Sequence, residues 1–229
     1  MKMVKKIVVF GLVVVLVALA AKEYLGYHYF YKYKNVSSHA NSIEGSFSEL
    51  EENLKKTVRF SKNPLFYKEL AQLYLEMAVV ENEFGTDEKR DVNLDRARES
   101  LNHLIKRNPI DAFAYYQMGI VYLLYNYPLL TYRDKENLYF LKALELNPVD
   151  EFLNLNILFI YLTQWDFLNN EEKSFVIKRL GKMWNSNERF IPQLRNRWKK
   201  NFGDVERLKE ILSLDKELWI EIKKFFSKP

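Results

Sequence analysis

The chain of 229 residues contains no cysteine, and its seven glycines and six prolines are few for its length. Without cysteine the chain cannot form disulfides, a thiol nucleophile, a cysteine-ligated zinc site or an iron–sulfur cluster. The scarcity of glycine and proline disfavours a turn-rich β-barrel or β-sandwich and favours long helices. No stretch shows convincing two-residue alternation of apolar and polar side chains. We therefore expect an all-α protein.

The sequence patterns of common catalytic and nucleotide-binding sites are also missing. The chain has no G-x-x-x-x-G-K-[ST], G-x-G-x-x-G, G-x-S-x-G or H-E-x-x-H motif, and it has only three histidines. The acidic cluster within residues 87–91 lacks the glycine and the terminal glutamate of a calcium loop and indicates a solvated loop. We expect a protein that is not an enzyme, with no catalytic or metal-binding residues and no cofactor.

Residues 1–34 combine a basic start with a long apolar run. Residues 1–6 hold three lysines and precede Ile7–Ala21, a run without any charge. This order is typical of a secretory signal or of a signal-anchor that inserts with its amino end in the cytoplasm. As a helix the run is about 22 Å long, short of a hydrocarbon core of roughly 30 Å. The tyrosines and lysines of residues 22–34 suit the headgroup region and would supply the missing length.

These features predict three segments before the main body of the protein. We expect a basic cytoplasmic head at 1–6, a transmembrane signal-anchor at 7–25, and an interfacial aromatic segment with an irregular polar linker at 26–46. The alternative is cleavage near Ala20, because Ala18-Leu19-Ala20 fits a signal-peptide cleavage site. Cleavage would leave a secreted or periplasmic protein.

The rest of the chain predicts helices in pairs, because apolar residues recur at steps of three and four and Asn-Pro pairs separate the segments. Proline in the first turn costs a helix nothing, since its N–H would be unpaired there anyway. The expected helices are 47–60, 64–83, 94–107, 112–125, 134–146, 151–165, 170–184, 205–214 and 216–226.

Two of these helices share the order aromatic, apolar, small, aromatic: Tyr115, Met118, Gly119 and Tyr122, and Tyr67, Leu70, Ala71 and Tyr74. The stretch 143–148 (ALELNP) closes a pair. With these features the chain resembles the tetratricopeptide-repeat family over about residues 63–185. The repeats are degenerate: Pro109 and Pro148 lie 39 residues apart against the usual 34, and Leu158 stands where the family has a small residue. The resemblance implies a right-handed helical-hairpin solenoid at 47–188, closed by capping helices at 189–229. An unrelated helical bundle is the alternative.

The resemblance also implies a binding groove, because in this family the first helix of each pair lines a concave surface for a partner segment. The corresponding groove candidates are Lys68, Gln72, Phe113, Tyr116, Ile120, Phe152, Leu155 and Phe159. The alternative is burial of these side chains between neighbouring helices, since two of the helices are apolar all round.

Cations and aromatic residues alternate in the segment 189–202, RFIPQLRNRWKKNF. Such a mixture favours an anionic partner. The candidates are Arg189, Arg195, Arg197, Trp198, Lys199 and Lys200. The alternative is a helix with its aromatic residues packed inward and its cations solvated. We expect no nucleic acid, because the anchor would place this segment outside the cytoplasm.

Together these patterns predict a non-enzymatic scaffold or adaptor for protein–protein interactions at the bacterial cell envelope. It would cross the inner (cytoplasmic) membrane once through 7–25, with the repeat domain outside the cytoplasm and membrane or envelope proteins as partners. The alternative is an envelope protein that binds polysaccharide or another anionic polymer through the same aromatic and basic surfaces.

Overall fold

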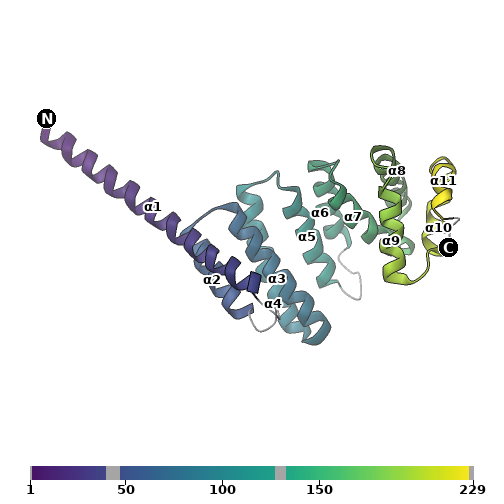
Figure 1. Cartoon of the computed structure of the whole chain (residues 1–229), viewed down its shortest axis with the longest axis horizontal. Helices are drawn as coiled ribbons and strands as arrows, with labels where there is room; N and C mark the ends of the chain where they lie inside the picture. The colour runs from purple at the N-terminus through teal and green to yellow at the C-terminus, as the bar shows by residue number, and fades with distance from the viewer. Residues whose placement is uncertain (1, 40–46, 127–132, 227–229) are drawn as a thin grey trace. The chain divides into compact units, whose positions relative to one another are not determined.

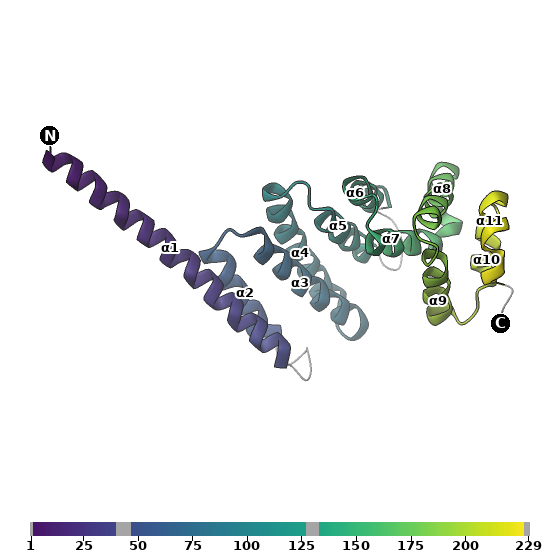
Figure 2. The same cartoon turned by 45° about the horizontal axis from the view of Figure 1, so that its top comes forward.

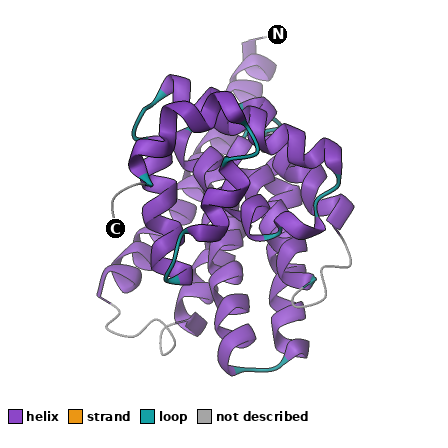
Figure 3. Ribbon diagram, turned by 90° about the vertical axis from the view of Figure 1, so that its right-hand side faces the viewer, coloured by secondary structure: helices purple, strands orange, loops and turns teal. Residues whose placement is uncertain are grey.

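The structure is a computed structural model that describes residues 2–39, 47–126 and 133–226; the side chains of 2–11, 13, 38, 39, 133 and 134 lie outside this description. Every regular element in the described residues is helical (Figure 3), which confirms the prediction of an all-α fold. The chain divides into two compact units, residues 1–139 (unit 1) and 140–229 (unit 2).

The helices follow one another with short connections (Figure 1). Unit 1 contains α1 (Lys2–His39), α2 (Phe47–Phe60), α3 (Pro64–Phe84), α4 (Asp87–Arg107), α5 (Ala112–Tyr125) and the start of α6 (Arg133–Leu146). Unit 2 contains the end of α6, then α7 (Glu151–Thr163), η2 (Trp165–Phe167), α8 (Asn170–Ser186), α9 (Phe190–Phe202), α10 (Glu206–Leu212), α11 (Lys216–Ile222) and η3 (Lys223–Phe225). The predicted helices all exist, and most ends agree within two residues.

Polar caps explain why the helix starts were predictable. Asn63, Asp111 and Asp150 each accept a hydrogen bond from a backbone N–H in the first turn of α3, α5 and α7. Such caps satisfy donors that would otherwise lack an intrahelical partner. At α8 the cap is Asn169, which forms a reciprocal capping box with Glu172.

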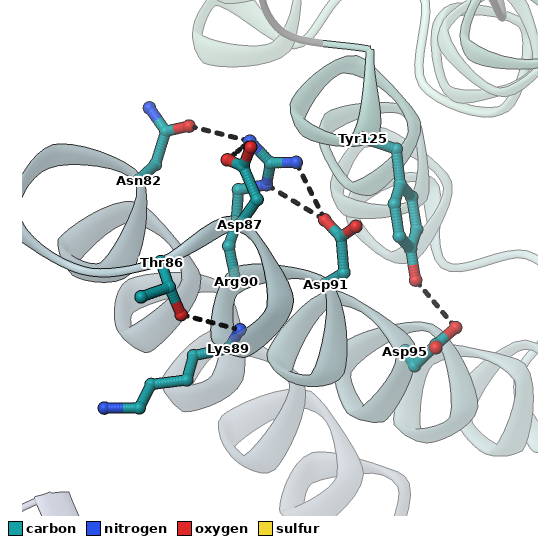
Figure 4. A network of polar contacts seen from close by, with 8 residues as sticks. All are labelled: Asn82, Thr86, Asp87, Lys89, Arg90, Asp91, Asp95 and Tyr125. Atoms are coloured by element: carbon teal, nitrogen blue, oxygen red, sulfur yellow. Dashed lines mark hydrogen bonds and ion pairs between the residues drawn. The ribbon is translucent and has the colours of Figure 1, made fainter.

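The charged stretch 85–93 is mostly helix rather than the predicted loop. Thr86 caps α4 by accepting a hydrogen bond from the Lys89 backbone N–H. The buried Arg90 guanidinium then pairs with Asp87 at 2.8 Å and Asp91 at 2.9 Å (Figure 4). Acidic residues in the first turn stabilise a helix, because they interact favourably with the positive end of its dipole. The cap, the helix dipole and the ion pairs of Arg90 therefore let α4 begin at Asp87, seven residues before the predicted start at 94.

The second half of α1 belongs to the core of unit 1. The prediction placed an interfacial segment and an irregular linker at 26–46, but α1 stays helical to His39. Phe30, Tyr33 and Val36, spaced by three residues, pack into the same cluster as the buried residues of α2, α3 and α4. The first half of α1 extends beyond α2, α3 and α4 in both views (Figures 1 and 2). Residues 40–46 of the predicted linker lie outside the described residues.

Unit 2 has its own core around α7. This helix packs against α8 and α9, and α8 packs against α9. Fully buried side chains from each of these helices fill the space between them: Ile157, Leu158, Leu162, Leu180 and Phe190. Leu158, which replaces the small residue of the repeat pattern, is thus accommodated in the core.

Candidate partner-binding surfaces

The predicted groove residues of α7 and the predicted basic segment meet on one surface, which we call the α7–α9 surface. The ring of Phe159 on α7 lies 6.0 Å from that of Trp198 and 6.1 Å from that of Phe202, both on α9. The guanidinium of Arg197 lies 4.4 Å from the Phe159 ring centre. Phe152, earlier on α7, is 56% exposed, and Phe202 is 51% exposed.

Arg197 is held in place from two sides. Its guanidinium stacks on Phe159 and donates a hydrogen bond of 2.8 Å to the side-chain oxygen of Asn156. Asn156 is itself only 8% exposed and donates to the Phe152 backbone carbonyl. A cation fixed in this way loses little conformational freedom when it binds an anionic or polar group. The α7–α9 surface therefore presents an oriented cation stacked on a half-buried aromatic ring.

The predicted anionic-partner residues divide into core and surface. Trp198 is only 4% exposed and packs inward with Phe190, Ile191 and Leu194, as the alternative of inward-packed aromatic residues expects. The period of α9 places these four residues on one face. On the other faces, Arg189, Lys199 and Lys200 are exposed, while Arg195 is half-buried with its guanidinium 6.0 Å from the Phe226 ring.

A second predicted set lies together on α3 and α5 of unit 1. The Lys68 ammonium lies 4.3 Å from the ring centre of Phe113, and the Phe113 and Tyr116 rings are 5.6 Å apart. Gln72 is exposed and donates to Glu76 on its own helix, and Ile120 packs against the core of unit 1. Phe113, Tyr116, Leu155 and Phe159 are all half-buried. These four groove candidates are thus neither fully exposed, as in an open groove, nor fully buried between helices.

The sequence patterns did not indicate a cluster of tyrosines between α4, α5 and α6. Tyr122 and Tyr139 stack at 5.4 Å, and the Tyr125 hydroxyl donates to Asp95 at 2.7 Å. A cavity of about 210 Å³ lies beside this cluster and is bordered by Asp95, Arg98, Tyr122, Tyr125 and Lys135. Burial, followed by the hydrogen bond to Asp95 and its negative charge, raises the pKa of Tyr125. The cluster joins residues from three helices, so no spacing within one segment could have revealed it.

The described side chains in the first half of α1 form an exposed apolar surface at residues 12–19. Its exposed fractions lie between 50% and 62% for Leu12, Val14, Val15, Leu16, Val17 and Leu19. Among the residues whose side chains are described, no helix has an apolar stretch long enough to cross a membrane. Residues 7–11 and 13 of the predicted anchor lie outside that set.

Comparison with known proteins adds no assignment. No protein-family model matches the chain, and no curated protein is similar enough to it in sequence to count as a relative. Within the described part of the chain, no three His, Asp or Glu side chains are grouped so that they could hold a metal ion.

Proposed function

We propose that this protein is a non-enzymatic scaffold of the tetratricopeptide-repeat type that captures a partner protein at the bacterial cell envelope. The α7–α9 surface is the observation that carries this proposal. Aromatic side chains and arginine are the residues that most often dominate the binding energy of protein interfaces. Here Phe159, Phe202 and Arg197 lie side by side on two adjacent helices of unit 2, and Phe152 is exposed two turns earlier on α7.

The proposal includes a single-pass anchor at residues 7–25, with the amino end in the cytoplasm and the rest of both units outside it. The basic head and the uncharged run Ile7–Ala21 favour this orientation. The apolar side chains exposed around the first half of α1 need an apolar environment, which lipid supplies. An anchored scaffold works by tethering, because confinement to the membrane raises its effective concentration near membrane-bound partners.

The second candidate function is binding of an acidic envelope polysaccharide. The tyrosine cluster with Arg98 and Lys135 favours this candidate, since aromatic rings can pack on sugar rings while cations pair with acidic groups. The exposed Arg189, Lys199 and Lys200 of α9 add positive charge outside that cluster. Nucleic acid is not expected as a partner, for the reason of location already given.

Capture of partners from membranes tests the main proposal. We expect the tagged full-length chain, cross-linked in membranes and purified, to retain a specific envelope protein. Phe202→Ala and Arg197→Ala should each reduce its recovery about tenfold, which corresponds to roughly 1.4 kcal/mol. Phe167→Ala is the matched control, because Phe167 is 64% exposed in unit 2 and belongs to η2, outside the α7–α9 surface.

The competing outcomes are distinct. Equal losses for Phe167→Ala and Phe202→Ala would show that the α7–α9 surface does not select the partner. Binding of alginate, an acidic polysaccharide, by the same preparation would favour the second candidate if Arg98→Ala abolished it. Thermal melts of all variants separate lost binding from lost folding, and Phe202→Ala should melt close to the parent because half of its ring is already in solvent.

A further inference from the structure

The later helices of unit 1 have a fixed position along α1, because they pack against its second half in a defined register. The Asn63 side chain donates to the Tyr27 hydroxyl at 3.0 Å, and the Tyr33 hydroxyl donates to Glu69 at 3.1 Å. Both pairs are 36 residues apart in sequence. α3 therefore runs parallel to α1, and its start is level with Tyr27.

Other contacts show which connections between helices lie at the same position along α1 as Tyr27. Gly26 lies against Ser61, in the connection from α2 to α3. The Arg107 guanidinium lies 4.7 Å from the ring centre of Tyr67, so α4 ends near the start of α3. The α2–α3 and α4–α5 connections thus lie at the same end of unit 1, the end from which the first half of α1 extends (Figure 2).

The length of the proposed anchor places this end at a membrane surface. A hydrocarbon core of about 30 Å takes roughly 20 helical residues at 1.5 Å each, so a span that begins at Ile7 ends near Gly26. The headgroup layer adds about 5–8 Å on each side, which corresponds to the next three to five residues. Tyr27 and the α2–α3 connection beside it then lie in the headgroup layer.

The side chains at this end suit an anionic lipid surface. We call it the basic end, and it comprises the cations Arg59, Lys62, Lys106 and Arg107 and the exposed side chains of Tyr27, Leu65 and Ile110. The acid among its described residues is Asp111, which is occupied as the cap of α5. Lysines, arginines and tyrosines are enriched at the headgroup level, and exposed leucine or isoleucine can insert among the lipids.

The opposite end of unit 1 has the reverse charge. The α3–α4 connection and the helix turns beside it carry the acids Glu81, Glu83, Asp87, Glu88 and Asp91 against Lys89 and Arg90. α2 shows the same polarity within one helix, with Glu49, Glu51 and Glu52 in its first half and Lys55, Lys56 and Arg59 in its second half. Charge therefore changes sign along the direction of α1, with the positive end toward the anchor.

From this register and polarity we propose that the basic end of unit 1 lies against the headgroups of an anionic phospholipid bilayer. This inference rests on the proposed anchor and goes beyond it: the bilayer contacts the folded body as well as α1. Unit 1 is then held at a set depth, since α1 enters it as an unbroken helix.

The absence of native cysteine allows single labels to measure depth in the full-length chain. Leu16→Cys reports the anchor, Ile110→Cys the basic end, and Phe84→Cys the opposite end, and these three side chains are 55%, 74% and 78% exposed. Each variant, carrying an environment-sensitive fluorophore, is reconstituted in phosphatidylglycerol–phosphatidylcholine nanodiscs with spin-labelled lipids. We expect acyl-chain labels to quench position 16. Headgroup labels should quench position 110 several-fold more strongly than position 84.

Charge variants then test the lipid contact. In the Ile110→Cys background, the double substitution Lys62→Glu and Lys106→Glu should lower the quenching by headgroup labels. Replacing the mixed lipids with pure phosphatidylcholine should lower it as well. Lys89→Glu is the control, because it reverses the charge of an exposed lysine at the opposite end, and it should leave the quenching unchanged.

The possible failures are separable. No quenching at position 16 would overturn the anchor itself. Quenching at position 16 with equal quenching at positions 84 and 110 would overturn only the lipid contact of the basic end. Coupling between labels of two copies at position 110, independent of lipid charge, would assign that surface to a second copy and also overturn the lipid contact.

Discussion

At Glu51, three helices of unit 1 meet around one carboxylate. Lys55 of α2 approaches it at 2.7 Å, Arg96 of α4 at 3.3 Å, and the Tyr74 hydroxyl of α3 donates to it at 3.0 Å. Burial raises the pKa of Glu51, but the hydrogen bonds from Lys55 and Tyr74 and the positive charges of Lys55 and Arg96 together outweigh it, so the net shift is downward. Burial, followed by the charge of Glu51, raises the pKa of Tyr74.

This arrangement predicts a loss of stability at alkaline pH. An unfolded tyrosine titrates near 10.0 and folded Tyr74 titrates higher, so the neutral phenol contributes stability that is complete below pH 10. That stability is lost as the pH rises through the folded pKa. In denaturant titrations followed by circular dichroism, Tyr74→Phe should show a shallower decline above pH 10 than the parent. Tyr31→Phe, which removes a phenol that is 67% exposed, should decline as steeply as the parent.

At the scale of the helices, the close approach of Gly26 to Ser61 determines how α1 packs against the rest of unit 1. A Cβ added at Gly26 would lie 2.7 Å from the Ser61 Cβ and 3.3 Å from the Ser61 backbone nitrogen. Ser61 is 1% exposed and has little room to move. Phe30 and Tyr33 pack one and two turns further along α1, so a body that began at residue 47 would lose part of its core.

Two glycine substitutions should therefore have opposite effects. Gly26→Ala should lower the free energy of unfolding by about 1–3 kcal/mol, because overpacking separates α1 from α2. Gly181→Ala in α8 should raise it by about 0.5–1 kcal/mol, since the new methyl meets nothing within 4 Å and alanine favours the helix. Chemical denaturation measures both. A stabilised Gly26→Ala variant would contradict the tight contact with Ser61.

At the scale of the whole molecule, the two units have separate cores. Unit 1 is centred on residues such as Leu101 and unit 2 on residues such as Leu180, both fully buried. The four tryptophans, Trp165, Trp184, Trp198 and Trp219, all belong to unit 2. Tryptophan fluorescence therefore reports the unfolding of unit 2, whereas circular dichroism reports both units.

Core substitutions should accordingly separate the two signals. Leu101→Ala should destabilise unit 1 by about 2–5 kcal/mol and shift part of the circular-dichroism transition, while the fluorescence midpoint stays in place. Leu180→Ala, the matched change in unit 2, should shift the fluorescence midpoint. Equal shifts of both signals by Leu101→Ala would mean that the units unfold as one.

The amino-acid sequence by itself determined most of the helices and most of their starts. Pro64 and the caps Asn63, Asp111 and Asp150 act within one turn, so their effect does not depend on distant residues. The extension of α4 was missed because its charged first turn looked like a solvated loop. The buried Arg90, which holds that turn together, could not be distinguished by sequence from an exposed arginine.

Only the tertiary structure decided which faces are core and which surfaces meet. The pattern of α9 alternates cations and aromatic rings, and packing against α7 and α8 selected Trp198 for the interior. Phe159 and Arg197 are 38 residues apart, and helix periodicity carries no information on which helix lies opposite. The second half of α1 looked like an interface and linker because its partners, α2 and α3, come later in the chain. Local interactions set the helices, and long-range packing set the surfaces.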